Sequence, residues 1–125
     1  MGIIETFFFD TYAFFEILKG NPQYERYGKG VGIMTTKLNL MELYYGLLLS
    51  RGKVEAEHWY EEYGPFVVPI DDFILKRACE LKALFKERKL SYVDCVGYII
   101  AKARGVKFLT GDRQFKDLEN VEYVK

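Results

Sequence analysis

The chain has 125 residues, half of them hydrophobic and 17% aromatic, which is enough for a single domain over residues 1–125 whose core needs no disulfides. Its 18 Lys and Arg balance its 18 Asp and Glu, so the net charge of zero argues against a strongly basic nucleic-acid-binding domain. The chain has no run of about 18 apolar residues and its two cysteines are scattered, so we expect no membrane span, no disulfide scaffold and a cytoplasmic location.

Short apolar runs alternate with helical stretches along the chain, and glycines mark most of the helix ends. The predicted elements, in chain order, are a strand at 7–9, a helix from 11 to about 19, a strand at 31–34, a helix from about 37 to 50, a helix at 53–63, a strand at 66–69, a helix from about 72 to 88, a helix at 92–104, a strand at 107–109, a short helix after 112 and a strand at 121–124. Good N-cap residues are available where three of the helices begin, at Thr35 or Thr36, at Asp71 or Asp72, and at Ser91.

The strands are continuous apolar runs rather than alternating ones, and helices separate them. This pattern is typical of a parallel sheet that is covered on both faces. The predicted fold class is therefore α/β, a three-layer α/β/α sandwich with a mostly parallel sheet of four or five strands. Ligands in such folds bind beyond the carboxyl ends of the strands, so we expect the chemistry there.

Two aspartates follow predicted strands directly. Asp10 ends the first strand, and Asp112 lies just past the strand at 107–109. Because the carboxyl ends of parallel strands meet at one end of the sheet, both side chains are expected in the same region. Each aspartate also precedes a helix, so N-capping is the alternative role for both.

Glu42 lies inside a predicted helix whose neighbouring positions are mostly apolar. At helical spacing it is flanked by Leu38, Tyr45, Gly46 and Leu49. A helix this apolar is predicted to be largely buried. No Lys or Arg lies three or four positions away, so a buried Glu42 needs a cation from elsewhere or a raised pKa. Solvent exposure at the edge of the helix is the alternative.

Asp94 follows Ser91 by three residues, which matches a capping box. Gly97 and Ala101 share its helical face, and their small size would let the helix approach the sheet closely. That approach would bring Asp94 over the strand ends. Capping and cation binding are compatible, because a carboxylate has two oxygens.

Asp10, Glu42, Asp94 and Asp112 can thus converge on one cleft as a catalytic, metal-binding quartet. Carboxylates about 5 Å apart repel by roughly 3 kcal/mol per pair at an effective dielectric near 20, and a divalent cation relieves this repulsion. Oxygen ligands favour Mg²⁺ or Mn²⁺, which can polarise a phosphodiester and activate water. The only histidine is His58, so zinc sites of the Cys/His type and histidine-based nucleophile chemistry are poorly supported.

Four segments carry a resemblance to the PIN-domain nucleases and, among them, the VapC-like toxins of toxin–antitoxin pairs. They are FDTYAF at 9–14, LMELYYG at 40–46, SYVD at 91–94 with Ala101 downstream, and FLTGDRQF at 108–115. Each motif is weak alone, whereas the four in this order, spread over nearly the whole chain, are specific.

The resemblance implies a PIN-like fold and Mg²⁺- or Mn²⁺-dependent cleavage of RNA by a homodimer. It places the family's acidic residues at Asp10, Glu42, Asp94 and Asp112, with the Thr110 hydroxyl beside the last acid. The capping box adds Ser91 as the residue that supports Asp94. The resemblance also implies neutralisation by a small VapB-like antitoxin. The neutral net charge departs from what an RNA binder leads one to expect and leaves a DNA flap open as the substrate.

Two other classes of protein fit parts of the pattern. The first is a phosphoryl-accepting α/β domain, since Asp10-Thr11 resembles the start of the haloacid-dehalogenase motif, but Tyr12 occupies the position where that family has a second Asp. The second is a non-catalytic PIN-like scaffold that only binds partners. An intact acidic quartet argues against it, because binding alone does not need clustered carboxylates.

Overall fold

The computed structural model describes residues 3–125. Its elements, in chain order, are β1 (Thr6–Phe9), α1 (Thr11–Leu18), the 3-10 helix η1 (Pro22–Tyr27), β2 (Gly32–Met34), α2 (Lys37–Arg51), α3 (Lys53–Tyr63), η2 (Gly64–Phe66), α4 (Asp72–Leu84), α5 (Tyr92–Arg104), β3 (Lys107–Thr110), η3 (Arg113–Phe115) and β4 (Val121–Tyr123). Within the described range, none of these helices is long and apolar enough to cross a bilayer.

The four strands form one parallel sheet in the order β2-β1-β3-β4. The central strand β1 pairs with β2 on one side and with β3 on the other, so Phe8 lies between Met34 and Phe108. The strand β4 pairs in parallel with β3 at the far side. All four strands therefore end at the same end of the sheet, as the sequence predicted.

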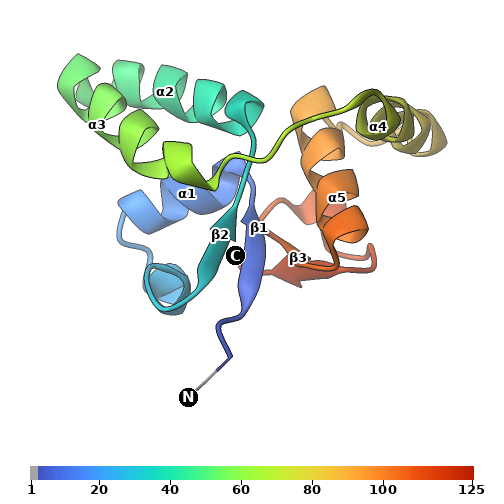
Figure 1. Ribbon diagram of the computed structural model, residues 1–125, viewed down its shortest axis with the longest axis horizontal. Coiled ribbons are helices and arrows are strands. Elements are labelled where there is room, and N and C mark those ends of the chain that lie inside the picture. The colour runs from blue at the N-terminus through green and yellow to red at the C-terminus, as the bar shows by residue number, and fades with distance from the viewer. Residues whose placement is uncertain (1–2) are drawn as a thin grey trace.

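Three consecutive phenylalanines of β1 divide the core into two parts, because successive side chains of a strand point to opposite faces. Phe7 and Phe9 belong to a buried cluster with side chains of α1, η1, α2 and α3. Phe8 belongs to a second buried cluster with side chains of α4, α5 and β3. Figure 1 shows the resulting three layers, with α1, α2 and α3 on one side of the sheet and α5 and α4 on the other. The predicted α/β/α sandwich is confirmed.

The prediction of a strand at 66–69 is wrong. This segment makes one isolated parallel bridge, between Val67 and Thr35, with hydrogen bonds from Thr35 N to Phe66 O at 3.1 Å and from Val68 N to Thr35 O at 2.9 Å. Pro69 follows immediately and has no N–H with which to continue a ladder. The chain instead crosses from the α3 side of the sheet to the α4 side, as Figure 1 shows.

Two further local differences separate prediction from structure. The helix expected to run toward Arg88 ends at Leu84. Arg88 lies in the following turn and forms a two-pronged ion pair with Asp117, at 2.8 and 2.9 Å. The 3-10 helix η1 was not predicted, although Asn21 caps it and Pro22 begins it.

Gly97 lets α5 lie directly on the sheet. A Cβ atom at this position would lie 2.6 Å from the Phe8 ring and 3.1 Å from the Phe108 ring. Both rings are fully buried, so neither can move aside cheaply. The close approach that was predicted from Gly97 is confirmed, and it brings the first turn of α5 to the carboxyl end of β1.

We expect Gly97→Ala to lower the free energy of unfolding by about 1–3 kcal/mol, because the added methyl group overpacks the core. The matched control is Gly64→Ala, where nothing lies within 4 Å of the added methyl group, and this variant should be neutral or slightly stabilised. Denaturant midpoints of both variants and the parent provide the measurement. Equal midpoints for the two variants would mean that α5 does not depend on close packing at Gly97.

Candidate active site

Asp10 is a carboxylate buried at the end of the central strand. Asp10 is only 2% exposed, and its Oδ1 accepts a hydrogen bond from Ala13 N at 2.8 Å, which caps α1. Burial raises the pKa of Asp10 to about 8, an effect that the Thr110 hydroxyl and Ala13 N–H reduce and that the negative charge of Asp94 increases. Without a cation, Asp10 is therefore largely protonated at neutral pH.

Asp94 lies in the first turn of α5 and completes the predicted capping box. Its backbone N–H donates to Ser91 Oγ at 3.0 Å, and its Oδ2 accepts from Ser91 N at 3.3 Å. Burial raises the pKa of Asp94, the Ser91 hydrogen bonds lower it, and the charges of Asp112 and Glu42 raise it further. Asp94 is thus electrostatically coupled to both of these acids.

Asp112 follows β3 and caps the short helix η3. Its Oδ1 accepts from Gln114 N at 2.9 Å, and its own N–H donates to Thr110 Oγ1 at 3.0 Å. Thr110 is fully buried and also stabilises the charged form of Asp10. The hydroxyl residue expected beside the last acid therefore touches both strand-end aspartates.

Glu42 lies on α2, and its setting differs from the prediction. The helix is not buried all round, because Met41, Tyr45 and Leu49 are 57%, 64% and 72% exposed. Glu42 itself is half-buried. The wrong inference arose because apolar residues on α2 line both the core and an open surface, so hydrophobicity alone did not give the burial.

A hydroxyl network that the sequence analysis missed holds Glu42 in place. Thr11 Oγ1 donates to Glu42 Oε1 at 2.6 Å and accepts from Asn39 Nδ2 at 3.2 Å. Asn39 is buried and in turn accepts at Oδ1 from the Thr36 hydroxyl at 2.6 Å. Two signals were present in the sequence: Thr11 directly follows Asp10, and Asn39 precedes Glu42 by one helical turn.

The three aspartates line one cleft of about 340 Å³, together with side chains from α1, the β3–η3 turn and the C-terminus. The remaining lining residues are Tyr12, Gly111, Arg113, Gln114 and Lys125. Glu42 does not line this cleft, although its charge raises the pKa of Asp94. The structure thus brings together Asp10, Asp94 and Asp112, with Glu42 beside them on α2.

The donor set of this cleft fits a hard divalent cation. Within residues 3–125, none of the ion pairs involves any of the four acids, although Arg113 and Lys125 also line the cleft. In the same range, no three acidic, His or Cys side chains converge closely enough to coordinate one ion. Mg²⁺ is commonly held by only one or two carboxylates and keeps several waters, so it suits carboxylates spaced in this way. The four-ligand set stays a prediction.

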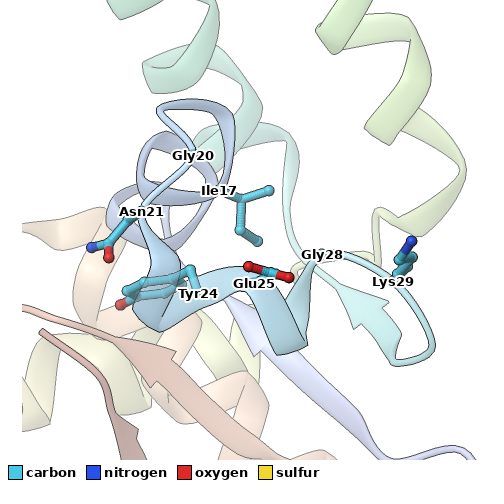
Figure 2. A pocket seen from close by; sticks show the side chains of 7 residues that line it. All are labelled: Ile17, Gly20, Asn21, Tyr24, Glu25, Gly28 and Lys29. Carbon is cyan, nitrogen blue, oxygen red and sulfur yellow. The ribbon is translucent and has the colours of Figure 1, made fainter.

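A second hollow, of about 280 Å³, lies between the end of α1 and η1 (Figure 2). Its charged lining residues are Glu25 and Lys29, both exposed. Since none of the four acids lines it, the candidate site is the acidic cleft.

The fold is a parallel α/β/α sandwich with aspartates gathered at the carboxyl end of its sheet. The PIN domain family model matches residues 7–121, and the chain belongs to this family. Membership sets aside the phosphoryl-accepting alternative. No curated protein matches the sequence.

Several solved structures share the fold. The sarcin-ricin loop cleaving toxin VapC20 from Mycobacterium tuberculosis has a TM-score of 0.73 and 20% identity, covering 95% of this chain and 99% of that one. DNA-bound VapBC from Salmonella typhimurium has a TM-score of 0.72 and 19% identity, covering 97% of each chain. A toxin–antitoxin complex from Klebsiella pneumoniae has a TM-score of 0.72 and 16% identity, covering 92% and 94%. At such identities the likeness is one of fold.

The raised pKa of Asp10 predicts how the stability of the metal-free protein changes with pH. A carboxyl group with a pKa of about 8 when folded and near 4 when unfolded stabilises the fold below pH 4, and this contribution is lost as pH rises to 8. Asp10→Asn removes this loss and can keep the α1 cap. The mutant should gain on the order of 5 kcal/mol relative to the parent between pH 4 and pH 8.

Unfolding in denaturant with EDTA, across this pH range, measures the gain. The matched control is Asp71→Asn, which changes an exposed N-cap on α4 outside the cleft, and its profile should run parallel to that of the parent. If the free energy of unfolding of Asp10→Asn also runs parallel to that of the parent across this pH range, burial does not disfavour the ionised form of Asp10.

Proposed function

We propose that this chain is a Mg²⁺- or Mn²⁺-dependent endoribonuclease and the toxin of a toxin–antitoxin pair. The observation that carries the proposal is the burial of Asp10, without an ion-pair partner among residues 3–125, in a cleft that Asp94 and Asp112 also line. Membership of the PIN domain family and the likeness to a toxin described as cleaving the sarcin-ricin loop support it.

Asp10, Asp94 and Asp112 would surround the cation, one or two of them binding it directly and the others through its waters, and Glu42 would complete the acidic set. Each aspartate already uses one oxygen to cap its helix or to accept from the cap residue, which fixes the direction of its carboxylate. Thr11 fixes Glu42 in the same way, and Thr110 orients the strand-end pair. The site would thus be organised before substrate arrives, which is what electrostatic catalysis requires.

When bound, the cation would neutralise charge on the phosphodiester and lower the pKa of an attacking water. The chain's own part is to position the scissile phosphate at the carboxyl end of the sheet and to keep Asp10 away from bulk water. Because burial raises the pKa of Asp10, binding of a cation beside it would favour the loss of a proton from this carboxyl group. Attack by water leaves a 5′-phosphate and a 3′-hydroxyl, and the 2′-hydroxyl is not consumed.

The partners in this proposal are a second copy of the chain, RNA and a VapB-like antitoxin. Solved structures with this fold include a toxin–antitoxin complex from Klebsiella pneumoniae and DNA-bound VapBC from Salmonella typhimurium. An antitoxin arginine that enters the cleft could bridge two carboxylates with its planar fork. Such a contact would take the place of the cation and inhibit the enzyme.

The cleavage test uses the purified, partner-free chain with structured RNAs and with a DNA flap, in Mg²⁺, Mn²⁺ or EDTA. We expect cleavage of RNA with either metal, none in EDTA, and 5′-phosphate ends. Asp94→Asn should lower the rate by orders of magnitude while the fold survives, and the exposed cap variant Asp71→Asn should cleave like the parent. Cyclic phosphate products, or activity in EDTA, would contradict the proposal, and a folded chain inert in all conditions would favour the non-catalytic scaffold.

Metal-dependent stability gives a readout without catalysis. We expect Asp112→Asn to stabilise the metal-free protein by about 1 kcal/mol, because it removes one repelling charge and Asn caps a helix as well as Asp does. Mn²⁺ at a hundred times its dissociation constant should stabilise the parent by about 2.7 kcal/mol and the mutant by much less. Denaturant midpoints with EDTA and with Mn²⁺ are the measurement. Equal Mn²⁺ shifts, with a destabilised mutant, would make Asp112 a helix cap only.

A further inference from the structure

A basic pocket of about 340 Å³ lies between α4 and the start of α5, outside the acidic cleft. We define it by its charged and aromatic lining residues, Lys82, Lys86, Arg88 and Tyr92. No acidic side chain lines it among the described residues. Its chemistry is therefore opposite to that of the acidic cleft, and it suits an anion beside an aromatic or flat group.

Tyr92 and Lys82 form an ordered pair in this pocket. Lys82 Nζ donates to Leu90 O at 2.5 Å and lies 5.0 Å from the centre of the Tyr92 ring. Tyr92 is nevertheless 68% exposed. A fixed positive charge thus lies beside the ring, and much of the surface of the ring remains available to a ligand.

Two short connections link residues of the pocket to residues of the acidic cleft. Arg88 lines the pocket and donates from Nη1 at 2.7 Å to the carbonyl of Gln114, a residue that lines the cleft. Tyr92 lies two residues before Asp94 in the first turn of α5. A chain molecule that leaves the cleft across the start of α5 therefore meets Tyr92 first and the lysines of α4 next.

The distribution of charge agrees with this path. Residues 76–92 contain six Lys or Arg and two Asp or Glu, although the whole chain is neutral. Asp117 pairs with Arg88, whereas Lys86 forms no ion pair with any residue in 3–125. The zero net charge thus conceals a local positive surface next to the site, which answers the objection that the sequence raised against RNA binding.

We propose that the basic pocket binds the single-stranded RNA segment that flanks the cleaved bond. In this arrangement Lys82 and Lys86 contact the phosphate backbone, and one unpaired base stacks on Tyr92. Single-stranded nucleic acids are commonly bound by this combination of backbone cations and aromatic platforms. The inference rests on the proposed nuclease function and adds the surface that holds the substrate outside the cleft.

The test is the binding of a fluorescently labelled single-stranded RNA in EDTA, followed by anisotropy over a range of salt concentrations. Tyr92→Leu should weaken binding about tenfold through the loss of stacking. Lys86→Gln should weaken it and lower the slope of log affinity against log salt by about 0.7, the value for one phosphate contact. The matched control, Lys107→Gln, changes an exposed lysine where β3 begins, at the opposite end of the sheet, and should behave like the parent.

Both test positions are exposed, so the variants should fold. Lys82 is left unchanged because its ammonium group holds the Leu90 carbonyl. In Mg²⁺ or Mn²⁺, Lys86→Gln should raise KM for a long RNA and leave kcat unchanged, and it should not affect cleavage of a dinucleotide too short to reach the pocket.

Failure of this inference is distinguishable from failure of the proposed function. If RNA is cleaved but both variants bind and cleave like the parent, the pocket is not part of the substrate path and the nuclease stands. If the variants lose RNA binding while the parent cleaves nothing, the pocket stands and the nuclease does not. Polyglutamate, added at the same concentration of charge as the RNA, serves as a competitor. If it displaces the RNA, and if Tyr92→Leu changes neither the affinity for RNA nor the affinity for polyglutamate, the pocket binds an acidic peptide and the RNA assignment is overturned.

Discussion

The arrangement of the whole molecule depends on keeping one carboxyl group, that of Asp10, out of water at the end of the central strand. The strand β1 is buried on both faces by Phe7, Phe8 and Phe9. Asp10 follows these residues directly and therefore lies between the helices of the two layers. Holding an ionised carboxylate away from water at this point costs free energy, and this cost raises the pKa of Asp10. The neighbouring polar groups, Ala13 N–H and the Thr110 hydroxyl, offset only part of that cost.

The other acids reach this point because helix beginnings and strand ends coincide at one end of a parallel sheet. Asp94 and Asp112 are anchored by the backbone of their own short segments, so their positions follow from secondary structure and not from long side-chain contacts. Glu42 depends instead on Thr11, 31 residues away in the chain. The site thus combines locally fixed aspartates with one glutamate whose position depends on how α2 packs against α1.

What the sequence could predict follows the same division. The sheet, the three layers and the aspartates at strand and helix ends could be inferred, because apolar runs, cap residues and chain polarity are local properties. The bridge from Asn39 through Thr11 could not, since it joins residues 28 apart that only the fold brings together. The composition of the run at 66–69 favours a strand, but composition does not show whether an unpaired edge of the sheet lies close enough to pair with it. The exposed apolar side of α2 was missed for a similar reason, since the amount of hydrophobic surface does not show what covers it.

The capping geometry of the aspartates has an evolutionary consequence. A single base change converts an aspartate codon into an asparagine codon, and asparagine begins a helix as well as aspartate does. Such a change at Asp10 or Asp112 would abolish the charge needed for the proposed chemistry and still leave a well-folded domain. A single base change at either codon would therefore inactivate the proposed enzyme and still leave a folded protein. A domain built in this way can lose the proposed activity by inheritance without losing its shape.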